Sequence, residues 1–156
     1  MSRKNNSIFS KPFIKSLFFM QNEWHQHGVF LHTLRVTYYA LRGGDFRFFA
    51  AGLLHDVGKP FVAHQKEEDI EHGEYSFMDH EERSYQIIKN WFFISRYTKL
   101  IVRHHYLIRD IKKHKIKEPL RYQSKKEIWE SLDEKMQEDL KRFLVYDDMG
   151  KGKKRR

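Results

Sequence analysis

A chain of 156 residues is long enough to form one domain with a sizeable buried core. It contains no cysteine, which excludes disulfide bonds, thiolate metal sites and cysteine nucleophiles and is typical of a cytoplasmic protein. The net charge of +9 favours an anionic partner, and because no stretch approaches about 18 consecutive apolar residues we expect no membrane contact.

Apolar residues recur at helical spacing, which predicts an all-α fold, a single bundle of about 6–7 helices. No run of alternating polar and β-branched residues is long enough to predict a sheet. We divide the chain into an N-terminal segment that packs on the domain (1–22), the domain itself (23–150) and a basic flexible tail (151–156). Helices are expected near 29–41, 46–57, 80–93, 96–108, 125–131 and 134–148, with a shorter one near 13–19.

Local signals predict where several of these helices begin and end. Gly43-Gly44 should end the first long helix, and Asp45 is placed to cap the next one. Capping boxes are predicted at Asp79–Glu82 and at Ser131–Glu134, each just before or within the first turn of a helix.

Two long connections separate the expected helices. Residues 58–79 contain two glycines and a proline around a charged middle, and they join two helices that carry candidate ligands. Long connections in compact domains are often functional, so we expect 58–79 to border the mouth of a site. The second connection, 109–123, is strongly basic and is expected to contact a nucleotide or nucleic acid.

His55-Asp56 is the most informative pair in the sequence. An apolar helical stretch ends on these two metal-competent side chains and is then stopped by Gly58 and Pro60. Neighbouring helical residues point about 100° apart, so they converge on one ion most easily at a helix end. Taken alone, the pair can also be an accident of sequence.

Other candidate ligands lie on apolar helical stripes elsewhere in the chain, which makes an accident a poorer explanation. A carboxylate on a core-facing stripe is costly to bury and normally needs a cation or a metal. His105 lies about 100° round its helix from His104, so we rank it second. The first-choice candidates are His32, His80, His104 and Asp147.

The order His, His-Asp, His, His, Asp resembles the HD superfamily of metal-dependent phosphohydrolases, above all the HD domain of bacterial CCA-adding enzymes and poly(A) polymerases. The resemblance runs from about Trp24 to Gly150, although Met78-Asp79 stands where the family usually has a small residue before the histidine. We expect the HD domain alone, without the nucleotidyltransferase domain of those enzymes. The segments that carry the resemblance are Glu23–Leu34, Ala51–Pro60, Phe77–Ser84 and Tyr146–Gly150.

The resemblance implies one or two bound ions, with Asp56 bridging when both are present. An imidazole and carboxylate set without sulfur suits Mn, Fe, Co, Ni or Zn, and Mg is a further candidate. Such an ion activates water for attack on phosphorus, which makes Asp56 a predicted catalytic residue as well as a ligand. The implied first site comprises His32, His55, Asp56 and Asp147, and the implied second ion is held by His80 and His104.

Several further side chains are candidates for substrate contact. Lys59 resembles the family lysine that contacts phosphate, and we predict a catalytic role for it, although a surface lysine is the alternative. Arg83 and Arg35 are candidate phosphate contacts that can equally be surface residues. His27 lies just upstream of the first motif histidine and is, with His105, a second-choice ligand or substrate contact.

We therefore expect a phosphohydrolase that cleaves phosphodiester or phosphomonoester bonds in nucleotides or at RNA ends; the resemblance implies 2′,3′-cyclic phosphodiesterase and phosphatase activity. The alternatives are a small-nucleotide hydrolase and a non-catalytic nucleic-acid-binding module with a structural metal. Five positive charges lie in 151–156, so removing them from the +9 leaves +4 for the rest. The tail and 109–123 are expected to contact nucleic acid, with a merely solubilising tail as the alternative.

Overall fold

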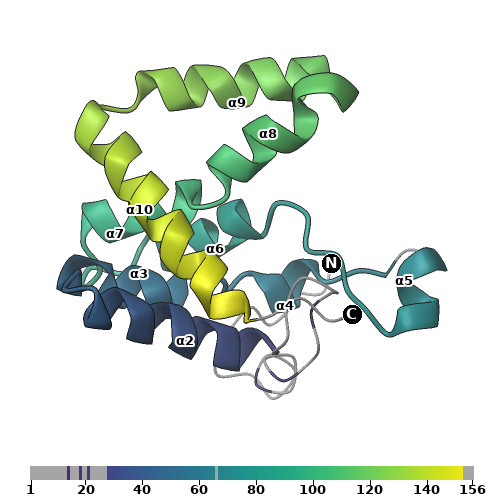
Figure 1. The fold of residues 1–156 in the computed structure, drawn as a ribbon, viewed down its shortest axis with the longest axis horizontal. Helices are drawn as coiled ribbons and strands as arrows, with labels where there is room; N and C mark the ends of the chain where they lie inside the picture. Colours follow the sequence, from purple (N-terminus) through teal and green to yellow (C-terminus); the bar gives the residue numbers. More distant parts are fainter. Residues whose placement is uncertain (1–13, 15–17, 19–20, 22–27, 66, 153–156) are drawn as a thin grey trace.

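The computed structural model describes residues 14, 18, 21, 28–65 and 67–152, and its regular elements there are helical apart from one isolated bridge between His64 and Ser76. The predicted all-α fold is confirmed. None of the helices is both long and apolar enough to cross a membrane. In chain order (Figure 1) they are α2 (Val29–Arg42), η1 (Phe46–Phe48, a 3₁₀ helix), α3 (Phe49–Leu54), α4 (Lys59–Val62), α5 (Glu67–His72), α6 (His80–Ile88), α7 (Arg96–His104), α8 (Leu107–Lys117), α9 (Pro119–Ser131) and α10 (Glu134–Lys151).

The helix predicted over 46–57 is divided into three parts. A 3₁₀ turn precedes α3, and the chain turns at residues 55–58 before α4 begins at Lys59. Gly52 allows α3 to pack closely on α2, because a Cβ atom added there would lie only 2.7 Å from Thr37 Oγ1. The turn therefore follows directly after a helix that is fixed against its neighbour, and it carries the His-Asp pair.

The two long connections are more ordered than the sequence indicated. Residues 58–79 contain α4 and α5, and the expectation of an irregular basic loop over 109–123 is wrong. That stretch belongs to α8 and α9, separated by Glu118 alone. Lysine and arginine are good helix formers, and Pro119 occupies the first turn of α9, where a proline without a free N–H is tolerated.

Two predicted capping boxes are also wrong. Asp79 adopts a left-handed conformation (φ 56°), makes no capping bond and pairs instead with Arg121 at 2.7 Å. The cap of α10 is Asp133, whose carboxylate accepts a 2.7 Å hydrogen bond from Met136 N, while Ser131 still lies in α9. Asp79 therefore pairs with a distant arginine instead of capping α6, and a neighbouring aspartate caps α10 in place of Ser131.

The end of α2 agrees with the sequence, but the role of Asp45 does not. Gly43 is the C-terminal cap of α2, and Gly44 has the positive φ (79°) that glycine tolerates. Asp45 makes no capping hydrogen bond. Its carboxylate accepts a 2.6 Å hydrogen bond from the hydroxyl of Tyr146 and pairs with Arg142, so it ties the α2–η1 turn to α10.

The core lies where α10 crosses α2 and packs against α7, with α3 packed against α2 and α7 (Figure 1). Phe143 of α10 is fully buried, and its ring centroid lies 5.5 Å from that of Phe48, 5.6 Å from His55 and 6.3 Å from His105. One aromatic side chain thus belongs both to the hydrophobic core and to the wall around two candidate ligands. By contrast, α9 buries no residue and projects from the bundle with α8.

Phe143→Ala should lower the free energy of unfolding by about 3–5 kcal/mol, because it leaves a cavity in the core. Phe92→Ala removes the same side chain from a position that is 95% exposed and should change stability by less than about 0.5 kcal/mol. Urea denaturation of both variants measures the difference. Equal losses would contradict this assignment of the core.

Candidate metal centre

Six titratable side chains from separate parts of the chain converge in the interior, and none is more than 5% exposed. They form two sets of three, and in each set the candidate ligand atoms lie within 4.8 Å of one another. The first set is His32 of α2, His55 of the turn after α3 and Asp147 of α10; the second is Asp56 of that turn, His80 at the start of α6 and His105 just after α7.

Asp56 lies between the two sets. Its Oδ2 atom is 3.4 Å from His32 Nε2 and 3.3 Å from His55 Nε2. Its Oδ1 atom is 3.4 Å from His80 Nε2 and 3.8 Å from His105 Nε2. One carboxylate therefore presents a different oxygen to each set, which is the arrangement that a bridging ligand needs.

The first set is closed by Asp147. Its Oδ1 atom lies 2.9 Å from His32 Nε2 and 3.7 Å from His55 Nε2, and the two imidazole nitrogens are 3.3 Å apart. Gly150, one turn further along α10, is needed here, because a Cβ at that position would crowd Val36 and lie 3.2 Å from the His32 ring. Helix α10 can therefore approach α2 closely enough to bring Asp147 to His32.

Three of the imidazoles are oriented in the same way. The Nδ1 atoms of His55, His80 and His105 lie 2.9, 2.8 and 2.7 Å from backbone carbonyl oxygens three residues earlier in the chain. Because a carbonyl oxygen only accepts, each Nδ1 carries a hydrogen and donates it. The Nε2 atom of each ring then faces the centre, as is usual for histidines that bind metals through Nε2.

In the second set two neutral imidazoles point their lone pairs at each other, an arrangement that a bound cation would stabilise. Burial lowers the pKa of His80 to about 4 and that of His105 well below its usual value, so both rings are neutral at pH 7. Their Nε2 lone pairs face each other at 3.2 Å. Ligands about 2.0–2.1 Å from one ion lie about 2.9–3.4 Å from each other in octahedral or tetrahedral geometry. The donors therefore fit a divalent ion between them.

The oxygens of Asp56 support the same fit. Both are fully buried, and Lys59 Nζ lies 2.6 Å from Oδ2. A buried carboxylate normally has several hydrogen-bond donors around it. Around Oδ1, however, the nearest candidate ligand atoms are the unprotonated Nε2 atoms of His80 and His105, at 3.4 and 3.8 Å, so a bound metal ion would supply a partner for that oxygen.

The charges of the centre are strongly coupled. Burial alone would raise the pKa of Asp56, but His55 and Lys59 hold it well below its usual range. Burial also opposes ionisation of Asp147, and hydrogen bonds from the imidazoles of the first set, together with Arg109, hold its pKa well below the usual range. Burial alone would lower the pKa of His55, but Asp56 and Asp147 raise it to about 9.

Arg109 is a part of the centre that the sequence did not reveal. Its guanidinium pairs with Asp147 and lies 2.7 Å from Asp148 Oδ1, bridging neighbouring carboxylates of α10. The sequence predicts a basic loop at this position, but Arg109 lies in α8, four residues after His105. The i, i+4 spacing from a candidate ligand is the signal that could have identified it.

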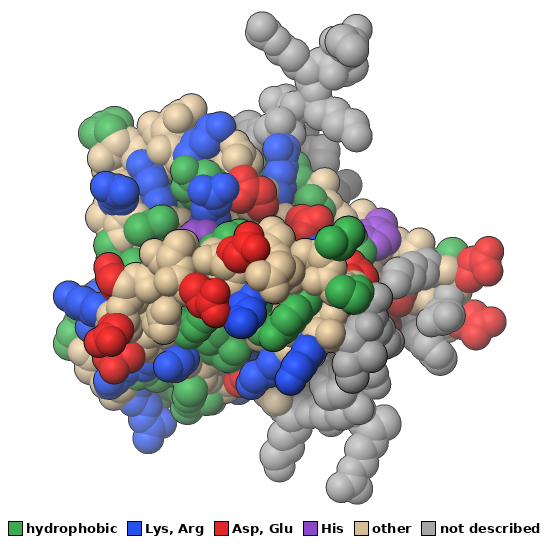
Figure 2. Space-filling view, turned by 90° about the horizontal axis from the view of Figure 1, so that it is seen from above, with side chains coloured by type: hydrophobic (Ala, Val, Ile, Leu, Met, Phe, Trp, Pro, Cys, Tyr) green, Lys and Arg blue, Asp and Glu red, His purple; other side chains and the backbone are tan. Residues whose placement is uncertain are grey.

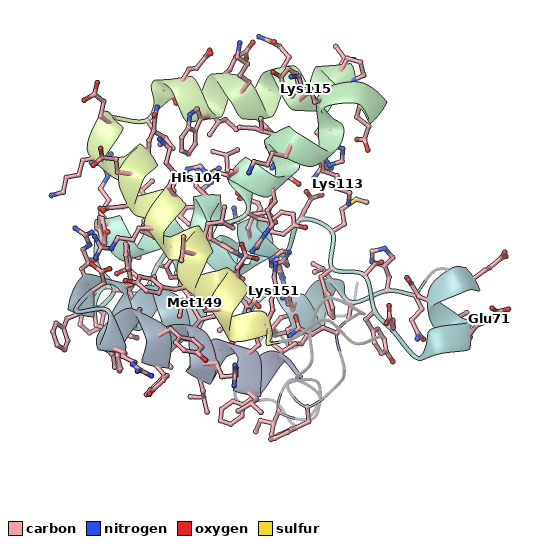
Figure 3. The ribbon with its side chains drawn as sticks, in the orientation of Figure 1. Glu71, His104, Lys113, Lys115, Met149 and Lys151 are labelled. Carbon is pink, nitrogen blue, oxygen red and sulfur yellow. The ribbon has the colours of Figure 1, made fainter. Side chains whose placement is uncertain are left out.

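The prediction that His104 faces the centre is wrong, and His105 takes that position. The buried stripe of α7 runs through Thr98, Ile101 and Val102, and His105 continues it. His104 instead lines a separate cavity between α6, α7, α8 and α9 (Figure 3). At the end of a helix, two neighbouring histidines fit the apolar pattern almost equally well, so the pattern favours a stripe one residue away from the buried one.

The other predicted contacts lie in different places. Lys59 is buried beside Asp56, whereas Arg35 donates a 3.2 Å hydrogen bond to Gly150 O and packs over the Tyr39 ring. The guanidinium of Arg83 lies over the ring of Phe61, 5.2 Å from its centroid. Within the described residues neither arginine pairs with a candidate ligand. His27 lies outside these residues.

Metal affinity should depend on pH because His55 has a raised pKa. Below about pH 9 the metal-free centre holds a proton on His55, which an incoming cation displaces. Affinity for Mn²⁺ should therefore rise up to about tenfold per pH unit between pH 7 and 9 and then level off, since one proton is exchanged. Titration calorimetry in buffers of different ionisation enthalpy measures both quantities; pH-independent affinity without proton release would contradict the assignment.

The pair His104 and His105 offers a matched test of the second set. His105→Ala should weaken binding of an ion there by more than about 100-fold, since loss of an outer partner of a ligand already costs about 10–100-fold. His104→Ala, one residue away, should leave binding unchanged. Metal-to-protein ratios after equilibrium dialysis compare the two variants. Greater loss from His104→Ala would overturn the placement of His105.

Comparison with known proteins agrees with this geometry. The searches of curated proteins and of solved structures each returned no match. The sequence matches the family described as HD domain over residues 29–145, a span that begins at α2 and ends within α10. Members of that family are generally metal-dependent hydrolases, and the match covers well over half of the chain. With its paired histidine and aspartate at the junction of both donor sets, the chain belongs to the HD domain family.

Proposed function

We propose that the protein hydrolyses phosphodiester or phosphomonoester bonds of nucleotides or RNA ends, with one or two divalent transition-metal ions held by the two donor sets. The position of Asp56 carries the proposal, because its two oxygens face different sets of imidazoles. Two ions that share a carboxylate suit the attacking and leaving oxygens of phosphoryl transfer. The histidine-rich donors favour Mn, Fe, Co, Ni or Zn over Mg.

A cleft beside the centre offers room for the rest of a substrate. It has a volume of about 370 Å³ and lies within the usual range for small-molecule sites, about 300–1,000 Å³. Lys59 and His80 line its inner end, while Phe77 and Tyr106 supply aromatic surface. Its size suits about one nucleotide, which favours a free nucleotide or a chain end over an internal bond.

The residues have separate roles in this proposal. The first set and the second set would hold the ions, and an ion bound there would lower the pKa of a coordinated water and polarise the phosphoryl group. Lys59 lies at the boundary between Asp56 and the cleft, so its ammonium is placed to contact a phosphate oxygen. Arg109 fixes Asp147 from the side of α8 and neutralises the adjacent carboxylate.

The choice between RNA ends and small nucleotides depends on surfaces near the cleft. The resemblance to the HD domain of CCA-adding enzymes supports a 2′,3′-cyclic phosphodiester at an RNA end. Exposed Lys112, Lys113 and Lys115 lie on α8, and Lys113 lines the cleft (Figure 3). On the face that Figure 2 shows, however, basic side chains lie among acidic and apolar ones. We therefore propose contact with a short end of a chain, and a small-nucleotide hydrolase is the second candidate.

A non-catalytic binding module with a structural metal is the remaining alternative. Structural sites are normally closed by protein ligands, whereas a catalytic ion keeps a position open for water or substrate. The second set adjoins the cleft through His80, which favours the catalytic interpretation. The predicted contact of the tail with nucleic acid concerns residues of which 153–156 lie outside the described part, and it stays a prediction.

The test is a substrate panel on protein freed of metal by a chelator and then supplied with Mn²⁺, Co²⁺ or Ni²⁺. The panel comprises a 2′,3′-cyclic mononucleotide, a nucleoside monophosphate and a short RNA with a cyclic phosphate end. Hydrolysis should require added metal, and Asp56→Asn should reduce kcat by at least about 100-fold because it removes charge at both donor sets.

Asp133→Asn is the matched control, because asparagine caps a helix as well as aspartate does and Asp133 is exposed. It should retain the wild-type rate. Hydrolysis by metal-stripped protein, or by Asp56→Asn at the wild-type rate, would contradict the proposed function. Bound metal with no hydrolysis on any substrate would favour the structural-metal alternative.

A further inference from the structure

Gln21 brings the part of the chain before α2 into the interior of the site. Its side chain is fully buried, and its backbone carbonyl accepts a 2.6 Å hydrogen bond from Tyr75 N, in the segment that leads to α6. Its side-chain Oε1 accepts a hydrogen bond from Lys59 Nζ. Gln21 thus lies far from the His55-Asp56 pair in sequence but next to Lys59 in space.

The ammonium of Lys59 is held by two oxygens. Asp56 Oδ2 lies 2.6 Å from Nζ, and Gln21 Oε1 accepts a hydrogen bond from Nζ. The ammonium also lies over the ring of Phe77, 5.5 Å from its centroid, where the ring face favours a cation. An ammonium has three N–H donors, and two are engaged by these oxygens; among the described residues no hydrogen bond engages the third, and Lys59 lines the cleft.

We propose that Gln21 is a positioning residue that holds the Lys59 ammonium at the inner end of the cleft, where it binds the anionic group of a phosphorylated substrate. The inference rests on the proposed function for the identity of that group. Gln21 precedes the first of the four motif segments, Glu23–Leu34, so the proposal gives a role in the site to a residue outside all of them.

The neutral amide explains how this can work. Asp56 Oδ2 also faces His32 and His55, so a lysine held by Asp56 alone would lie against the oxygen that the first set offers to an ion. Gln21 supplies a second acceptor, so the ammonium is shared between the carboxylate oxygen and a neutral amide oxygen. Because the amide has no charge, it does so without cancelling the positive charge that an anionic substrate needs.

Two substitutions separate the parts of this proposal. Gln21→Glu keeps the acceptor but adds a negative charge that pairs with Lys59, and Gln21→Met keeps most of the volume but removes the acceptor. In Mn²⁺-loaded protein the dissociation constant of inorganic phosphate should rise at least tenfold in Gln21→Glu and at least threefold in Gln21→Met. The loss in hydrolysis should fall on KM rather than on kcat, and Gln21→Glu should retain its metal.

The matched controls are Gln123→Glu and Gln123→Met, which make the same changes at an exposed glutamine of α9. They should bind phosphate like the wild type. A double-mutant cycle with Lys59→Met tests whether Gln21 acts through Lys59: Gln21→Met, which removes the acceptor without adding a charge, should weaken phosphate binding no further when Lys59 is already replaced. This comparison within one background also keeps the proposal testable if either single variant is less stable.

Calorimetric binding of phosphate decides the proposal independently of hydrolysis. If the wild type binds phosphate but hydrolyses no substrate, the proposed function fails while the comparison of variants still stands. Phosphate affinity within twofold of the wild type in both Gln21 variants would overturn the role of Gln21. So would a fall in kcat with unchanged affinity, an additive effect in the double variant, or the absence of phosphate binding by the wild type.

Discussion

Two buried carboxylates, Asp56 and Asp147, set the central constraint on this protein. Burying a carboxylate costs several kcal/mol unless cations or donors surround it, and these two share one interior space with four imidazoles. The chain provides Lys59 on one side and Arg109 on the other, and the raised pKa of His55 adds a proton in metal-free protein. Divalent ions would replace that proton and satisfy the neutral imidazoles at the same time. The need to surround these two carboxylates therefore explains why helices that are distant in sequence pack together.

Close packing of the helices makes this meeting geometrically feasible. Gly58 approaches α6 so closely that an added Cβ would lie 2.5 Å from both His80 O and Ser84 N, and its own N–H donates to Ser84 Oγ at 2.9 Å. Gly150 plays a similar part where α10 meets α2. The glycine after the His-Asp pair therefore does more than stop a helix: it fixes the distance between the turn that carries Asp56 and the helix that begins with His80.

The sequence predicted what depends on local pattern and missed what depends on distant partners. Apolar spacing predicted the all-α fold. With the His55-Asp56 pair at a helix end it pointed to six candidate ligands, of which the structure brings all but His104 into one cluster. It chose His104 over His105 because one residue at a helix end changes direction by about 100° without disturbing the pattern. Arg109 and Gln21 were not recognised as parts of the site, since only the ion pair of Arg109 with Asp147 and the hydrogen bond from Lys59 to Gln21 give them a role. The α8–α9 hairpin was missed because its basic composition resembled a loop.

We propose that ions lie on both sides of Asp56. Anomalous diffraction from crystals of the Mn²⁺-loaded protein can test this proposal, because it locates each ion independently of activity. One peak is expected within coordinating distance of His32, His55 and Asp147, and a second near His80 and His105, with Asp56 contacting both. A peak that involves His104, or an ordered ion that Asp56 does not contact, would contradict it.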